Sequence, residues 1–109
     1  MIGGFVTYGE QPTSFILRAI GPSLIQAGIP DALLDPTLEL YNGDGSLIAQ
    51  NDNWRSDHEQ QILDSTLAPT DDRESAIFAT LTAGPYSAIV RGAHNSTGTA
   101  VVEIYKPLP

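Results

Sequence analysis

The sequence predicts an all-β fold, an antiparallel β-sandwich of the jelly-roll or immunoglobulin-like type with one or two short helices in its crossovers. Three observations indicate this fold: about seven or eight short runs have strand composition, apolar residues alternate within several of them, and turns rich in glycine or proline separate them. The chain has 109 residues, enough for one domain with its own core and too few for two ordinary ones. We therefore expect a single sandwich module over residues 1–109.

The strongest element is a hairpin within Leu38–Trp54. Two strand-like runs, Leu38–Tyr41 and Ser46–Gln50, flank Asn42–Gly45, whose residues tolerate the positive φ angles of tight turns. The second run leads directly into Asn51, Asp52, Asn53 and the only tryptophan of the chain, Trp54.

The strands before this hairpin are Ile2–Tyr8 and Ser14–Ile20, for which a second hairpin is the simplest interpretation. Both alternating faces of 15–20 are apolar except at Arg18, which predicts a strand in the middle of a sheet with both faces covered. Residues 21–36 form a crossover over one end of the core, with Ser23 as a cap of a short helical turn.

A surface helix is expected over Ser56–Leu67, capped by Asp57 or Ser56, with Ile62, Leu63 and Leu67 on its buried side. The remaining strands are Ala76–Leu81, Tyr86–Arg91 and Thr99–Tyr105, the last two joined by a polar hairpin loop. The first and last strands, 2–8 and 99–105, are expected to be exposed edges that could pair with neighbouring copies.

Acidic residues dominate the charge, with 13 Asp and Glu against 5 Lys and Arg and a net charge of -8. This charge repels phosphate backbones and anionic membranes, so nucleic acid is not an expected partner. The chain contains no cysteine, which excludes disulfides, thiolate metal sites and cysteine nucleophiles. No run of about 18 apolar residues occurs, so membrane insertion is not expected.

The first residues, Met1–Val6, have strand composition and lack the basic and long apolar regions of a signal peptide. We interpret the chain as a module of a longer secreted protein, with Met1 either internal or added.

Several ordered motifs cover nearly the whole chain. They lie in Met1–Phe5, Ile16–Leu24, Asp35–Trp54, Pro69–Ile77, Leu81–Gly92 and Gly98–Tyr105. Together they resemble a bacterial extracellular module found in large secreted proteins, notably of Verrucomicrobia and Acidobacteria. More distantly, the hairpin with its Asn-Asp loop is similar to the pre-peptidase C-terminal and carbohydrate-binding sandwiches, which are accessory modules, some of them binding calcium or sugar. The resemblance implies an extracellular β-sandwich without an agreed activity.

Oxygen-rich side chains in two loops predict a hard-cation site, for which calcium is the best-suited ion. Calcium takes six to eight oxygen ligands, usually from loops that bend around it. The candidate ligands are Asn51, Asp52, Asn53, Asp71, Asp72 and Glu74. Asn and Asp are also favoured in turns that bond their own backbone, so a structural interpretation stays open.

A second, structural interpretation of Asp71, Asp72 and Glu74 is that they form ion pairs with Arg18 and Arg91. Both arginines lie within strands, where a partly buried guanidinium needs a carboxylate partner. This interpretation is favoured over metal binding.

Trp54 is a candidate sugar platform, with Asn51 and Asn53 as polar groups beside it, although single tryptophans in small sandwiches are more often core residues. No catalytic motif occurs, and His58 and His94 lie in polar surface contexts without a nucleophile nearby. We therefore expect a non-catalytic extracellular module for adhesion, surface attachment or array building. Calcium-dependent or carbohydrate binding and self-assembly through edge strands are the alternatives, with other modules, copies of the chain or glycans as partners.

Overall fold

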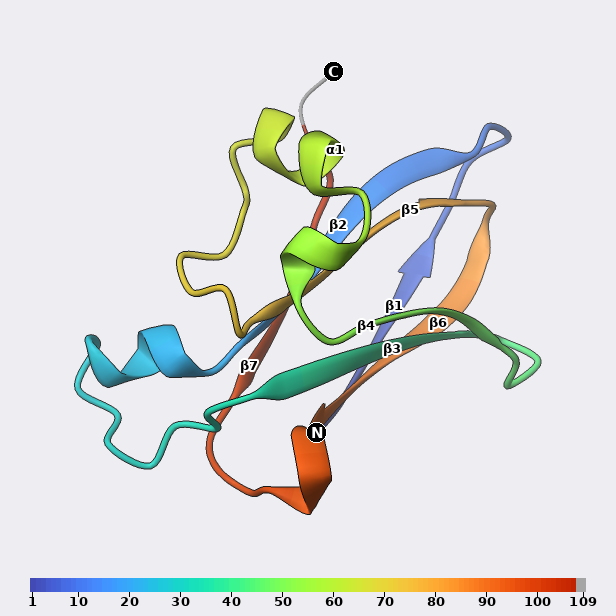
Figure 1. The fold of residues 1–109 in the computed structure, drawn as a ribbon. Helices are drawn as coiled ribbons and strands as arrows, with labels where there is room; N and C mark the ends of the chain where they lie inside the picture. The colour runs from blue at the N-terminus through green and yellow to red at the C-terminus, as the bar shows by residue number, and fades with distance from the viewer. Residues whose placement is uncertain (108–109) are drawn as a thin grey trace.

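The computed structural model describes residues 1–107 and confirms the all-β prediction. Seven strands form two antiparallel sheets that pack face to face (Figure 1). The four-stranded sheet has the order β1 (Ile2–Thr7), β6 (Gly84–Gly92), β3 (Pro36–Asn42), β4 (Leu47–Asn51). The three-stranded sheet has the order β5 (Ser75–Leu81), β2 (Thr13–Ile20), β7 (Val101–Tyr105).

The helical elements are short and lie in the connections. The 3-10 turns are η1 (Pro22–Ile25), η2 (Trp54–Ser56) and η3 (Ala93–Asn95), and the one α-helix of the described part of the chain is α1 (Glu59–Asp64). None of the helices within residues 1–107 is long and apolar enough to cross a membrane.

The predicted central hairpin is confirmed, because β3 pairs with β4 from Leu38↔Asn51 to Tyr41↔Leu47. The Asn42 side chain fixes its turn, since Oδ1 accepts hydrogen bonds from the backbone N–H groups of Asp44 and Ser46, each at 3.0 Å. A register shift between Leu40 and Tyr41 marks an irregularity on this pair of strands.

Two other predicted hairpins are wrong. β1 pairs with β6 whereas β2 pairs with β5 and β7, so the loop after β1 crosses from one sheet to the other. The loop between β6 and β7 also crosses between sheets. A loop of turn-forming residues has the same composition in both cases, because a hairpin and a sheet-to-sheet crossing need the same reversal of the chain.

The strand β2 lies between β5 and β7, as its two apolar faces predict. Its inner face contributes Leu17 and Ala19 to the core between the sheets, together with Leu38 and Leu40 of β3. Its outer face contributes Ile16 to a second cluster, described next. The two clusters explain why β2 has no exposed apolar side.

The second cluster lies between the outer face of the three-stranded sheet and the segment of η2 and α1 (Figure 1). Its fully buried side chains are Ile16, Trp54, Ile62 and Ala76. The predicted helix over residues 56–67 is therefore present only in part. Neither predicted cap is used, because His58 stands at the N-cap with a φ of 54° and no side-chain cap bond forms.

Candidate functional site

The fold brings the two oxygen-rich loops together, as the calcium prediction requires. The backbone N–H of Trp54 donates to the Glu74 carbonyl at 3.0 Å. The Asn51 side-chain oxygen accepts from the N–H of Ala76 at 3.1 Å, and the Ser75 hydroxyl donates to the Asp52 carbonyl at 2.7 Å. The contacts join the end of β4 to the start of β5, and they use the side-chain oxygen of Asn51, one of the predicted ligand atoms.

The six predicted ligands do not converge on one point. Asp71 bonds Arg73, Asp72 bonds Arg55, and Glu74 is fully buried in the protein. Within residues 1–107, no three acidic or histidine side chains are grouped so that they could hold a metal ion. Whether the chain binds calcium stays a prediction.

Glu74 is an internal anchor for the loop between β2 and η1. Its Oε2 accepts from the backbone N–H groups of Gly21 at 3.0 Å and Ser23 at 2.9 Å. Its Oε1 accepts from the Ser23 hydroxyl at 2.7 Å and from the N–H of Asp71 at 3.3 Å. Ser23 thus contacts Glu74 and does not cap a helix, because the cap position of η1 is taken by Gly21 without any side-chain bond.

Arg18 and Arg91 form ion pairs, but with partners other than the predicted ones. Arg18 donates from Nε to Glu103 at 3.0 Å, and its guanidinium lies 5.0 Å from the Tyr105 ring centre. Arg91 donates to Glu39 at 3.1 Å. Each partner lies on the neighbouring strand. Arg18 is in register with Glu103, and Arg91 is in register with Thr37, two positions from Glu39 on the same face of the sheet. Cross-strand pairing at short range replaces the longer reach to the 71–74 loop.

Trp54 is not a sugar platform, because only 1% of it is exposed. One face packs in the second cluster, and the Arg55 guanidinium lies 4.2 Å from the ring centre. Arg55 is held there by Glu59 at 2.8 Å and Asp72 at 2.7 Å. Asn53 is exposed beside it, whereas Asn51 is buried. The proposed aromatic surface for a sugar is therefore absent at this position.

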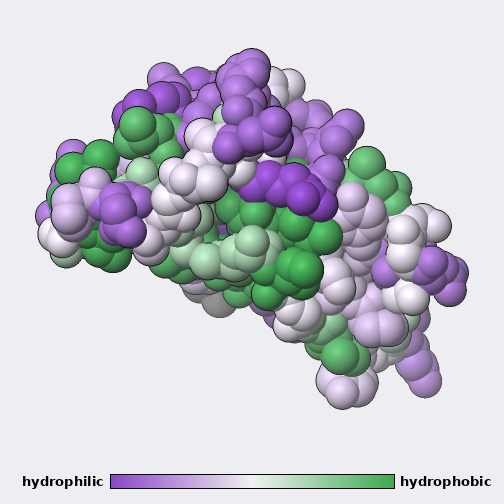
Figure 2. Space-filling view, turned by 90° about the horizontal axis from the view of Figure 1, so that it is seen from below, coloured by the Kyte–Doolittle hydropathy of each residue, from purple (hydrophilic) through white to green (hydrophobic). Residues whose placement is uncertain are grey.

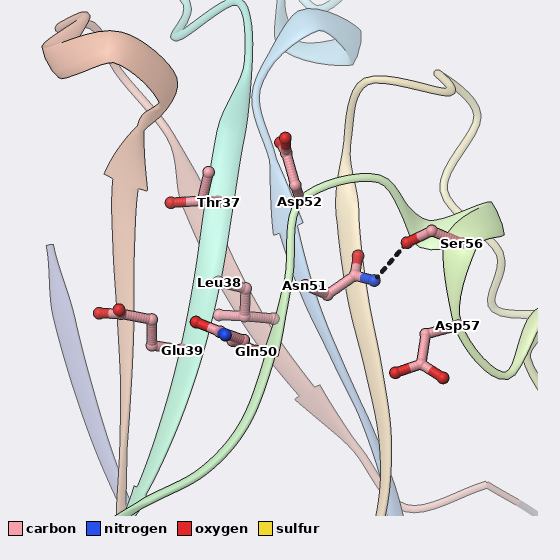
Figure 3. A pocket seen from close by; sticks show the side chains of 8 residues that line it. All are labelled: Thr37, Leu38, Glu39, Gln50, Asn51, Asp52, Ser56 and Asp57. Atoms are coloured by element: carbon pink, nitrogen blue, oxygen red, sulfur yellow. Dashed lines mark hydrogen bonds between the residues drawn. The ribbon is translucent and has the colours of Figure 1, made fainter.

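A groove of about 470 Å³ runs beside β3 and β4 and includes two of the predicted residues (Figure 3). Much of its polar lining is committed to bonds within the chain. Asn51 donates to Ser56 at 3.3 Å, Ser56 donates to the Asn53 carbonyl at 2.7 Å, and Glu39 holds Arg91. The lining residues are Thr37, Leu38, Glu39, Gln50, Asn51, Asp52, Ser56 and Asp57.

Two acidic side chains, Asp52 and Asp35, interact near this groove. Desolvation raises the pKa of Asp52 above its ordinary value, the negative charge of Asp35 and a hydrogen bond with it raise this pKa further, and His94 opposes them. One side-chain oxygen of Asp35, Oδ1, is buried without a hydrogen-bond partner. The carboxylates of Asp52 and Asp35 therefore repel each other, and the nearby positive groups, His94 for Asp52 and Arg73 for Asp35, offset this repulsion only in part.

Replacing Asp52 by Asn should stabilise the protein at neutral pH by up to about 1 kcal/mol, because the amide removes the repulsion and can donate to Asp35. The folded state binds a proton at Asp52 more tightly than the unfolded state does. Protonated Asp52 therefore favours the folded state. This contribution to the free energy of unfolding is fully present below the ordinary pKa of an aspartate, and it is lost as the pH rises through the raised pKa of Asp52 in the folded protein. Urea unfolding of both proteins at pH 3 and pH 7 should show the gain at pH 7 only; an equal gain at both would contradict this account.

The open edges of the sheets form the other candidate site, and they lie where the sequence predicts them. β1 ends the four-stranded sheet and β7 ends the three-stranded one. The two strands are neighbours across the sandwich, since a Cβ on Gly3 would lie 3.1 Å from Val102 Cγ1. The opposite side of the sandwich is closed, because the Asn51 and Ser75 bonds join β4 to β5 there.

The β1 edge lacks the features that normally protect an edge strand. Such edges usually carry lysine, proline, a bulge or a covering segment. Residues 2–7 read Ile-Gly-Gly-Phe-Val-Thr, without charge or proline, and their pairing with β6 shows no register shift. Ile2 and Val6 are exposed to 70% and 53%. β7 is better protected, because it contains Glu103 and is followed by Lys106 and Pro107.

Comparisons of the chain with protein-family models, with curated proteins and with solved structures find no match. They assign the chain to no family and carry over no ligand or activity.

Proposed function

We propose that this chain is a non-catalytic structural module of a secreted or cell-surface protein that attaches to its neighbours by strand addition at the edge of β1. The observation that carries the proposal is the edge itself, which is uncharged, regular and flanked by exposed Ile2 and Val6. An added strand completes the hydrogen bonds of such an edge, and its side chains cover the apolar ones. The extracellular location is supported by the motif resemblance described under Sequence analysis.

The surface around this edge favours association over small-molecule chemistry. Figure 2 shows a group of hydrophobic residues near the middle of one face, further hydrophobic groups toward its left and right edges, and hydrophilic residues above the central group. The outer face of the four-stranded sheet holds a shallow hollow of about 430 Å³, lined by Ile2, Tyr41, Pro85 and Ile89 among others. In contrast, three polar side chains of the groove in Figure 3 already take part in bonds within the chain: Asn51 with Ser56, Ser56 with the Asn53 carbonyl, and Glu39 with Arg91. We therefore place the attachment surface at β1.

Val6→Pro should weaken strand addition while leaving the fold intact. The bonds between Met1 and Val90 set the alternation along β1, which makes Val6 and Pro85 a non-bonded pair. The Val6 N–H therefore points to the open edge, so proline at position 6 removes no bond to β6 and blocks that edge. The probe is a panel of eight-residue extended peptides that includes the sequences of residues 1–8 and 99–106. At least one peptide should bind, and Val6→Pro should weaken it at least tenfold, which corresponds to about 1.4 kcal/mol.

Val6→Thr is the matched control, because it keeps the backbone N–H and the β-branched shape, and it should bind like the parent. Circular dichroism of all three proteins verifies that the fold persists. Equal peptide binding by Val6→Pro and the parent would overturn the proposal, as would a parent protein that binds no peptide of the panel and does not self-associate.

A further inference from the structure

The backbone groups that face the open edge follow from one hydrogen-bonded pair. The Met1 amine donates to the Val90 carbonyl at 3.2 Å, and the Val90 N–H donates to the Met1 carbonyl at 2.9 Å. Bonded and non-bonded pairs alternate along antiparallel strands. Gly3, Phe5 and Thr7 therefore bond β6, and the N–H and C=O groups of three other residues point away from it: Ile2, Gly4 and Val6.

Proline at position 85 agrees with this alternation. Pro85 lies opposite Val6, a non-bonded pair, where the missing N–H costs nothing toward β1. The side chains alternate with the same period, so Ile2 and Val6 also share the exposed outer face of the sheet. The open edge thus presents a regular apolar pattern with a glycine at its centre.

We infer that the strand added at the open edge of β1 is the β1 strand of a second copy of this chain. The two strands run antiparallel and are centred on Gly4; this inference rests on the function proposed above. In this register Ile2 faces Val6 of the second copy, Val6 faces its Ile2, and the two Gly4 residues meet on the two-fold axis. Each of the three pairs exchanges two hydrogen bonds, about six in all. A shift by two residues in either direction loses one pair.

The side chains and charges of the edge suit a copy of itself. The two outer pairs join isoleucine to valine, a favourable cross-strand combination, and no like charges meet at the contact. A β7 strand as partner would bring Glu103 against this apolar edge instead. The net charge of -8 on each chain still opposes association at long range, and salt screens that repulsion over about 10 Å at 0.1 M. The dimer should therefore form more readily at higher ionic strength.

Gly4→Cys tests the register directly. A Cβ at Gly4 has ordinary contact only, 3.9 Å from the Tyr86 carbonyl oxygen, and the chain has no other cysteine. The Cα atoms of a hydrogen-bonded antiparallel pair are about 5.5 Å apart, within the range of a disulfide. With oxidised glutathione at 0.3 M NaCl, most of the Gly4→Cys protein should become a disulfide-linked dimer. In 8 M urea, where β1 is unfolded, much less covalent dimer should form.

Ile2→Cys and Val6→Cys are the matched controls. Neither should cross-link alone, because like residues in this register lie roughly 13 Å apart, whereas a mixture of the two should give a covalent heterodimer. Ready cross-linking of Ile2→Cys or Val6→Cys alone would overturn the register. If peptides bind at β1 but none of these cysteines cross-links, the second copy is not the partner, although strand addition stands. If no peptide binds and no cysteine cross-links, both proposals fail.

Discussion

Glu74→Ala should lower the free energy of unfolding by about 3 to 5 kcal/mol, the largest effect expected from a single polar side chain in this protein. The carboxylate is fully buried and accepts four hydrogen bonds, from Gly21, Ser23 and Asp71. Alanine leaves buried donors without acceptors, and each such group costs about 1 to 3 kcal/mol. Space to shift is scarce, since a Cβ on Gly21 would already lie 2.0 Å from the Leu33 carbonyl oxygen.

Urea unfolding monitored by circular dichroism measures this change. Asp72→Ala on the same loop is the matched control, because Asp72 is exposed and its ion pair with Arg55 is worth at most about 1 kcal/mol. Glu74→Gln should fall between the two, since it retains one acceptor oxygen. A loss below about 1 kcal/mol for Glu74→Ala would show that water or a rearranged loop replaces the carboxylate.

Trp54→Ala should destabilise the protein by about 3 to 5 kcal/mol, the range for removing a large buried aromatic side chain. The indole is 1% exposed and packs with Ile16, Ile62 and Ala76. Its loss opens a cavity between the outer face of the three-stranded sheet and α1. It also removes the surface over which Arg55 lies.

Trp54→Phe separates packing from polarity. The indole nitrogen is buried without a hydrogen-bond partner, so phenylalanine removes an unsatisfied donor while keeping most of the aromatic contact. Phenylalanine is smaller than tryptophan and leaves part of the cavity, and we expect this loss of packing to outweigh the removed donor. Thermal or urea unfolding should then rank the proteins as parent, Trp54→Phe, Trp54→Ala in falling stability. Unchanged stability of Trp54→Ala would mean that the second cluster is not a core.

The architecture was predictable wherever a local pattern has a single structural meaning. The Asn42–Gly45 turn specifies a hairpin, and the two apolar faces around Arg18 specify a central strand; both are confirmed. The assignment of each strand to one of the two sheets was not predictable, because a turn such as Gly9–Pro12 can connect two strands of one sheet or lead the chain from one sheet to the other. The edge positions of 2–8 and 99–105 were predicted correctly, from strand composition at the two ends.

The site residues were harder to predict, because each depends on contacts distant in sequence. Glu74 was expected to bind a cation or an arginine, yet its acceptors are filled by backbone N–H groups 51 and 53 positions away. No side-chain pattern marks such backbone donors. The open face of β1 was signalled by the absence of charge in 2–7, which composition alone does show.

Amide hydrogen exchange along β1, measured by NMR during the peptide titration, is the most direct test of strand addition. In the dilute chain, the amides of Gly3, Phe5 and Thr7 should exchange slowly and those of Ile2, Gly4 and Val6 rapidly. Bound peptide should slow the exchange of the Ile2, Gly4 and Val6 amides to the rate of the Gly3, Phe5 and Thr7 amides. In Val6→Pro this slowing should not occur. Uniform protection along free β1, or an unchanged second set with peptide bound, would contradict the account.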